Sequence, residues 1–278
     1  MPGLVQHQQN GSSSPSPPTT SPNFQHLRIT KLHPTFAAEA SCDFPLASAS
    51  DDQFNEILHA IATYGVLVFR ATTLTDAQHV AFSRRFGALD DIRPYIQGGR
   101  KPRYDFYELF DAGNVDADGA VLTADSPRTH YGKGNGFFHV DSSFNPRRAG
   151  CSLLKASVLP PQGTGGETEF ADTRTAFETL PSSLQEKLKT EELVGVHSLH
   201  HSRKRGSPVY FADLDPEDYP MHRHRLAQVH EASGRWNLYM GAHMARIEGG
   251  DMGEVERWSL LWGLMGWATR PENVVKVE

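Results

Sequence analysis

Cysteine is nearly absent from this sequence of 278 residues, which contains only Cys42 and Cys151. The two residues lie far apart and form neither a C-x-x-C pair nor a zinc-finger spacing. A chain of this length can bury a substantial core without covalent cross-links. The scarcity of cysteine therefore excludes a disulfide-rich scaffold, argues against a cysteine-ligated metal, and fits a protein of a reducing compartment.

Long apolar runs and an excess of positive charge are also missing. No stretch approaches the roughly 18 apolar residues of a membrane span, and the first 25 residues contain neither Arg nor Lys nor the apolar segment of a secretory signal. With 27 Lys and Arg against 33 Asp and Glu, the net charge is −6, which attracts neither phosphate backbones nor anionic lipids. We expect a cytoplasmic protein that binds neither nucleic acid nor membrane.

Residues 1–24 are rich in Ser, Pro, Thr and Gln. They contain too few apolar side chains to offset the entropy lost on ordering the segment. From residue 25 onward there is no second linker of this composition and no internal repeat. We therefore expect a disordered tail over residues 1–24 and a single domain over residues 25–278.

Apolar residues at helical spacing predict helices in four places. The first follows an acidic N-cap at residue 51 or 52 and ends at Gly65. The second is expected over Thr75–Phe86, with Thr75 as its N-cap. Two more are expected after Pro181 and over Gly253–Trp267.

Short apolar runs broken by Gly and Pro predict strands. These runs are Val66–Phe69, Gly136–Val140, Cys151–Val158 and Leu193–His197. Strands framed by a few helices indicate a mainly β fold with flanking helices (α+β), in the form of a β-sandwich or jelly-roll barrel with its chemistry at the mouth.

The sharpest local feature is His139-Val140-Asp141, within FFHVDSSF. On a strand, side chains two residues apart share one face, so the imidazole and the carboxylate would point the same way. Together they form two thirds of the facial triad that binds non-haem Fe(II). The motif alone is weak, because a hydrogen-bonded His–Asp pair at a sheet edge has the same pattern.

Six blocks in order resemble the TauD/TfdA family of Fe(II)- and 2-oxoglutarate-dependent dioxygenases, from about Phe36 to the last residue. They are TLTDAQHVAFSRRFGAL, ELFDAGNVDADG, GNGFFHVDSSFNPRRAG, LPPQGTGGETEFADTRTAFETLP, LYMGAHMARIEG and WATRPENV. The resemblance implies a double-stranded β-helix (jelly roll, cupin-like). It also implies an oxidoreductase that uses Fe(II), 2-oxoglutarate as co-substrate and O₂ to hydroxylate a small, anionic organic metabolite.

The same resemblance assigns roles to individual residues. His139 and Asp141 match the first two iron ligands, and Thr168, after the glycines of the GGET segment, matches the threonine that bonds a carboxylate of 2-oxoglutarate. Asn135 matches a position that lines the substrate pocket, although a turn asparagine fits equally well. Arg93 and Tyr95 match positions that contact the anionic end of the substrate; a surface arginine and a packed tyrosine are the alternative.

The sequence departs from the family near its end. Relatives carry a third histidine ligand and an arginine that pairs with the far carboxylate of 2-oxoglutarate, in a region beyond Glu278 here. On that comparison the chain is C-terminally truncated and lacks the last strands of the fold. The alternative function is accordingly an inactive truncated paralogue or binding module that lacks the third iron ligand and the arginine. The substrate and the oligomeric state cannot be deduced from the sequence.

The remaining histidines and tryptophans receive no role in the chemistry. The cluster of His197, His200 and His201 and the pair His222 and His224 lie among Arg, Lys and Ser, which is typical of a solvated basic loop. His243 is expected to shape the pocket and not to bind metal. Trp258, Trp262 and Trp267 have helical spacing and are expected to pack in the core.

Overall fold

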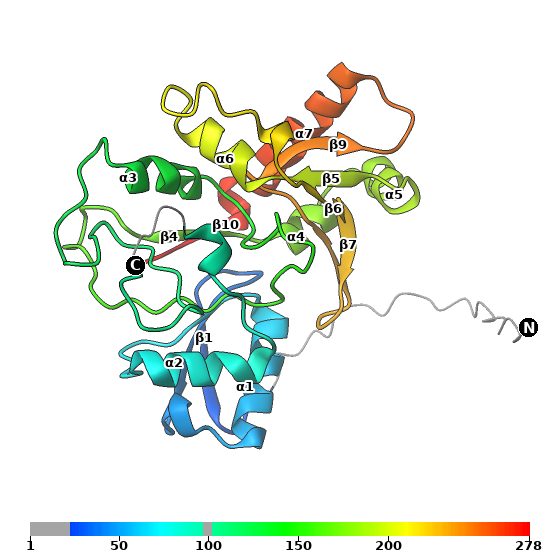
Figure 1. Ribbon diagram of the computed structural model, residues 1–278. Coiled ribbons are helices and arrows are strands. Elements are labelled where there is room, and N and C mark those ends of the chain that lie inside the picture. The colour runs from blue at the N-terminus through cyan, green and yellow to red at the C-terminus, as the bar shows by residue number, and fades with distance from the viewer. Residues whose placement is uncertain (1–22, 97–101) are drawn as a thin grey trace, which may run out of the picture.

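The computed structural model describes residues 23–96 and 102–278, and of Tyr95 only the backbone. The expected tail therefore lies almost wholly outside the described residues. The described chain is a mixed α/β fold in which small sheets and short helices surround long connecting loops (Figure 1). None of the helices in these ranges is long and apolar enough to cross a membrane.

The N-terminal elements form one end of the molecule, drawn in blue and cyan at the bottom of Figure 1. Strands β1 (Leu27–Lys31) and β2 (Ala38–Cys42) pair antiparallel, and the short β3 (Leu67–Val68) adds to β2 in parallel. Helices α1 (Asp51–Tyr64) and α2 (Asp76–Ser83) complete this end.

Both N-terminal helices begin where local sequence signals place them. Ser50 is the N-cap of α1 and forms a capping box with Gln53, so the prediction of Asp51 or Asp52 as cap was wrong by one or two residues. Asp51 and Asp52 lie in the first turn, where their charges face the positive end of the helix dipole. Gly65 ends the helix with a φ of 75°, a conformation that glycine adopts without strain.

Aromatic rings fill the space between α1 and α2. Phe54, Phe82 and Phe86 pack edge-to-face, with ring centroids between 4.9 and 5.9 Å apart. Thr75 caps α2 with a second capping box, and Phe86 lies on a 3₁₀ turn that follows the helix. The expected helix over 75–86 is therefore confirmed as an α-helix with a 3₁₀ extension.

The C-terminal half carries the other sheets. A three-stranded sheet has the order β6-β5-β9, and two further pairs are β7 with β8 and β4 with β10, all antiparallel. The strand bounds are β4 (Thr168–Ala171), β5 (Val194–His197), β6 (His222–Arg225), β7 (Ala227–His230), β8 (Arg235–Leu238), β9 (Met244–Glu248) and β10 (Val274–Val277). The helix bounds are α3 (Pro127–Gly132), α4 (Thr173–Glu178), α5 (Ser182–Thr190), α6 (Leu199–Gly206) and α7 (Glu254–Ala268).

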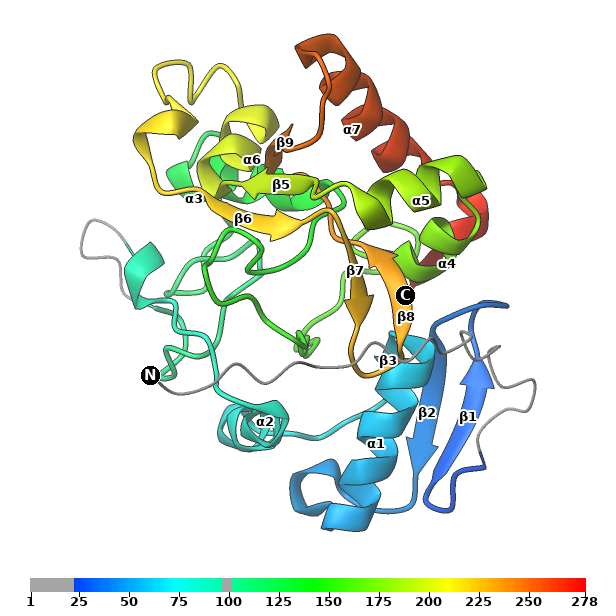
Figure 2. The same cartoon turned by 90° about the vertical axis from the view of Figure 1, so that its right-hand side faces the viewer.

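Helices cover the β6-β5-β9 sheet at the end of the molecule opposite to α1 and α2, as both views show (Figures 1 and 2). Leu261, Leu264 and Ala268 face inward from α7 and belong to the main core, which also contains Leu226 just before β7 and Leu238 of β8. The expectation for the tryptophans holds for Trp267 alone, which packs on this core. Trp258 and Trp262 lie on the outer face of α7 and are 40% and 47% exposed.

Arg174, one member of a buried ion pair at the start of α4, joins the C-terminal half of the molecule to the end of α1. Asp172 is the N-cap of α4, and Arg174, with Nε 3.5 Å from its carboxylate, donates to the carbonyl oxygens of Ala62 and Thr63 at the end of α1. Both side chains are less than one tenth exposed. This contact places the β4–β10 pair next to the N-terminal sheet.

Two of the expected strands are wrong. Gly136–Val140 and Cys151–Val158 form no strand, although Leu193–His197 and Val66–Phe69 each contain one. A strand needs a neighbour that supplies backbone hydrogen bonds. Within the described ranges, the first segment receives one such bond across the fold, from the amide of Ala242 to the carbonyl of Phe138, so apolar composition alone was an insufficient signal.

Candidate functional site

His139 and Asp141 meet side by side even though they lie on an extended loop and not on a strand. The Nε2 atom of His139 is 3.1 Å from Oδ1 of Asp141, and the Nδ1 atom of His139 is 2.7 Å from the backbone carbonyl oxygen of Phe137. The two side chains therefore point the same way, as expected. The strand on which that expectation was based is not formed.

The hydrogen-bond roles of the His139 ring follow from its partners. A carbonyl oxygen only accepts, so Nδ1 carries a proton, and Nε2 then directs a lone pair at a carboxylate unless it is also protonated. The bond to Asp141 raises the pKa of His139 and lowers that of Asp141. Two acceptors that face one another in this way fit a cation between them, because two ligands about 2.1 Å from one ion at right angles lie about 3 Å apart.

His243, Phe144 and Gly241 pack around His139 from one side. The ring of His243 packs edge-on against it with centroids 5.3 Å apart, and Phe144 contacts His243 from another side. Gly241 touches the His139 backbone so closely that an added Cβ would lie 2.7 Å from its Cα atom. His243 is 2% exposed and bonds Ser202 Oγ at 2.8 Å, and burial lowers its pKa to about 3.

Two histidines that we expected on a solvated loop lie in a sheet beside the Asp141 segment. His197 is on β5 and fully buried, with Nδ1 3.1 Å from Oγ of Ser143. His224 is on β6, and its Nε2 atom donates to the carbonyl oxygens of Ser143 and Asn145 at 2.9 and 3.2 Å. The expectation was wrong because successive residues of a strand point to opposite faces. Arg223 and Arg225 are exposed, while His224 between them points to the inner face.

His200 and His201 also leave the solvated loop that we expected. Both lie on α6, and the ring of His200 stacks on that of Tyr219 with centroids 3.7 Å apart. Burial lowers the pKa of each of these two histidines. They therefore serve packing in this helix.

Thr168 and Asn135 lie on separate elements. Thr168 is the first residue of β4 and pairs with Val277 of β10, and Gly165 and Gly166 before it have φ values of 94° and 92°, as a tight turn requires. Asn135 is exposed on a 3₁₀ turn four residues before His139. Neither residue forms a hydrogen bond with His139 or Asp141 in the described part of the chain.

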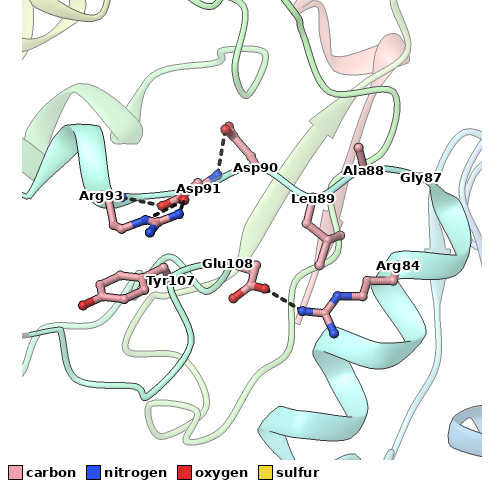
Figure 3. Close-up of a pocket in the computed structure, with 9 residues that line it drawn as sticks. All are labelled: Arg84, Gly87, Ala88, Leu89, Asp90, Asp91, Arg93, Tyr107 and Glu108. Carbon is pink, nitrogen blue, oxygen red and sulfur yellow. Dashed lines mark hydrogen bonds and ion pairs between the residues drawn. The ribbon is translucent and has the colours of Figure 1, made fainter.

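Arg93 lines a cavity of about 560 Å³, drawn in Figure 3. Its guanidinium is paired with Asp91 and lies over the ring of Tyr107, 5.2 Å from the centroid. Arg84 on the opposite wall is paired with Glu108 at 2.7 Å. Both arginines are thus neutralised by carboxylates, and an incoming anion has to compete with these carboxylates for the guanidinium groups. The side chain of Tyr95 lies outside the described part of the structure.

The cavity adjoins the Asp141 segment through Asp90. The Asp90 carboxylate lines the cavity and accepts hydrogen bonds from Ser142 Oγ at 3.0 Å and Asn145 Nδ2 at 3.3 Å. Sequence reasoning missed Asp90, Gly241 and His224. Only His224 had a usable signal, since residues 222 and 224 alternate along one strand.

A complete three-residue metal cluster is not found in the described ranges. No three side chains of His, Cys, Asp or Glu come close enough together there to hold an ion. What this part of the structure shows is one imidazole and one carboxylate in contact, those of His139 and Asp141.

Comparison with known proteins identifies the family. The chain belongs to the taurine catabolism dioxygenase TauD, TfdA family, which matches residues 28–278. By this family resemblance it is a 2-oxoglutarate-dependent dioxygenase. The sequence prediction of the family is confirmed.

Named relatives are similar over most of their length. The alpha-ketoglutarate-dependent 2,4-dichlorophenoxyacetate dioxygenases of Cupriavidus pinatubonensis and of a Burkholderia species are 35% and 33% identical, over 88% of this chain and 83% and 80% of theirs. The crystal structure of AAD-2 in complex with Mn(II) and N-oxalylglycine is 33% identical, with a TM-score of 0.80 over 91% of this chain and 86% of that one. A taurine dioxygenase structure from Burkholderia xenovorans, 22% identical with a TM-score of 0.62 over 90% of this chain and 76% of its own, shares the fold.

Proposed function

We propose that the protein binds Fe(II) through His139 and Asp141 and hydroxylates a small organic anion with 2-oxoglutarate and O₂. The observation that carries this proposal is the 3.1 Å approach of His139 Nε2 to Asp141 Oδ1, with Nδ1 occupied by the Phe137 carbonyl. When bound, the iron and 2-oxoglutarate would supply the oxidising power. The finer fold that goes with this function is a double-stranded β-helix.

The residues of this chain would bind the metal, orient its ligands and the co-substrate, and exclude water from the site. Phe137 sets the ring of His139 through its carbonyl, which fixes the tautomer that leaves Nε2 free to coordinate. Thr168, the first residue of β4, would donate a hydrogen bond from its hydroxyl group to a carboxylate of 2-oxoglutarate. The buried His243 and the half-buried Phe144 would keep water from this side of the site.

The relatives and the cavity beside Asp90 support the proposed substrate class. The named relatives act on 2,4-dichlorophenoxyacetate and (S)-phenoxypropionate, which are carboxylates that carry an aryl ether. Tyr107 and Leu89 offer apolar contact in the cavity, and Arg93 could pair with a carboxylate once released from Asp91. We propose Arg93 as a substrate-contacting residue on this basis, and Asn135 and Tyr95 on the basis of the family resemblance alone.

Iron retention tests the proposal directly. Purified protein is loaded with Fe(II) under anaerobic conditions, desalted and assayed for iron, beside His139→Ala, Asp141→Ala and the control His230→Ala. His230 bonds Ser233 next to the β7–β8 turn and takes no part in the site. We expect iron to be lost in the first two variants only. Stoichiometric iron in either of these variants would remove the pair as the metal site.

A second candidate is a binding module without turnover, because the described residues supply no third ligand. Release of labelled CO₂ from 2-oxoglutarate separates the two functions. Turnover that is lost in Asp141→Ala supports the enzyme, while metal binding without any CO₂ release supports the module.

A further inference from the structure

The residues that follow Asp141 form a tight turn with few backbone bonds of its own. Ser142 has a φ of 58°, in the left-handed region that a serine seldom occupies. Inside the turn, the amide of Ser143 bonds the carbonyl of Val140 at 3.4 Å, and that of Asn145 bonds the carbonyl of Ser142 at 2.9 Å. A strained turn persists only where its surroundings hold it, so the groups that contact residues 142–145 determine where Asp141 points.

Asp90 contacts the side chains of this turn, and His224 contacts its backbone. Its Nε2 atom lies 2.9 Å from the Ser143 carbonyl oxygen and 3.2 Å from that of Asn145. Because both partners can only accept, Nε2 carries the proton whether the ring is neutral or charged. The His224 side chain therefore donates hydrogen bonds to two carbonyl groups of the turn that have no partner from strand pairing.

The position of His224 in the sheet makes this contact rigid. It lies on β6 opposite Gly195 of β5, where an added Cβ would come within 2.9 Å of His197 Nε2 and 2.6 Å of Met244 Sδ. His197, on the same strand as Gly195, contacts the Ser143 hydroxyl, and the two imidazole rings lie 5.5 Å apart. Ser143 is thus contacted at its carbonyl by one histidine and at its hydroxyl by the other.

We infer that His224 is a positioning residue for the metal ligand Asp141, acting through the carbonyl groups of Ser143 and Asn145. The inference rests on the proposed function in that it takes Asp141 as a ligand. Groups that orient ligands from behind commonly change metal affinity by roughly 10–100-fold when they are removed. Since His224 acts through the backbone two residues beyond the ligand, we expect the lower end of that range.

A pair of variants isolates the donated hydrogen bond. His224→Met and His224→Gln place side chains of similar size at the same position, but only glutamine retains an N–H donor. Mn(II) affinity is measured by calorimetry in the presence of N-oxalylglycine, and Co(II) coordination by its visible absorption spectrum. His222→Met, on the same strand and in the same H-x-H motif, is the matched control.

We expect His224→Met to weaken Mn(II) binding about tenfold and to alter the Co(II) spectrum. His224→Gln should restore most of the affinity, and His222→Met should bind as the wild type does. Equal affinity in the Met and Gln variants would overturn the inference, whether that affinity is reduced or equal to that of the wild type. Either result leaves the proposed function intact if Asp141→Ala still abolishes binding, whereas wild-type binding in Asp141→Ala overturns the proposed function itself.

Discussion

The imidazole ring of His243 packs edge-on against that of His139, with centroids 5.3 Å apart and planes inclined by 75°. The two rings come from segments about one hundred residues apart, and His243 is almost completely buried. Its Nδ1 atom is already bonded to Ser202 Oγ. This geometry favours His243 as a packing surface for His139, in agreement with our expectation that it shapes the pocket.

Replacing His243 by phenylalanine separates packing from metal binding. The Phe ring keeps the edge-on contact and removes both nitrogens, while Ser202 keeps its bond to the Leu199 carbonyl. We expect His243→Phe to retain Fe(II) after desalting, whereas His139→Phe loses it. Loss of iron from His243→Phe would instead show that a nitrogen of His243 coordinates the metal.

Thr168 offers a test of co-substrate binding. Thr168→Val keeps the shape at the start of β4 and removes one hydroxyl, so a lost bond to a carboxylate should cost about 1.5–3 kcal/mol in 2-oxoglutarate affinity, roughly ten- to hundred-fold. Thr164→Val is the control, since that hydroxyl bonds the Pro161 carbonyl within the preceding loop. Titration of 2-oxoglutarate with unchanged affinity in Thr168→Val would mean that the GGET turn is structural only.

The ion pair between Asp172 and Arg174 predicts a large effect on stability. The Asp172 carboxylate accepts from the amides of Arg174 and Thr175 and from the Thr175 hydroxyl, all in a site that is nearly closed to water. Asp172→Ala leaves the buried guanidinium without its counter-charge, and we expect a loss of about 3–5 kcal/mol in the free energy of unfolding by urea.

An exposed cap provides the comparison for Asp172. Asp215 accepts from the amide of Glu217 at 3.0 Å at the start of a 3₁₀ turn and lies in solvent. Asp215→Ala should cost about 1 kcal/mol or less. Similar losses in the two variants would show that the buried ion pair adds nothing beyond a helix cap.

His197 predicts a loss of stability in acid. Burial lowers its pKa to about 3 in the folded chain, against about 6.5 when unfolded. The unfolded state therefore binds the proton first as the pH falls, so the contribution of the neutral ring is fully present above about pH 6.5 and is lost progressively below it. Between pH 7 and 5 the loss should be about 2 kcal/mol.

Denaturant unfolding of the wild type and His197→Gln at several pH values measures this contribution. We expect the gap in stability between the two proteins to narrow by about 2 kcal/mol from pH 7 to pH 5, because only the wild type has the group. A gap that stays constant over this range would mean that folding does not lower the pKa of His197.

Local signals were sufficient for most helices and for few of the strands. The helix after Ser50 and the helix after Thr75 are encoded by capping residues and apolar spacing within a dozen neighbours, so their ends could be predicted to within three residues. The segments 136–140 and 151–158 have the composition of strands, but pairing depends on residues far along the chain. No local pattern reports whether such a partner exists.

The sequence by itself determined the family and the pair His139 and Asp141, because motif order and spacing are properties of the chain alone. Only the tertiary structure decided what surrounds that pair. The contacts of His224 and His197 with Ser143, of Asp90 with Ser142 and of His243 with His139 each join residues more than 50 positions apart. Burial and hydrogen bonding set the charge and direction of these side chains, and both arise only when distant segments pack together.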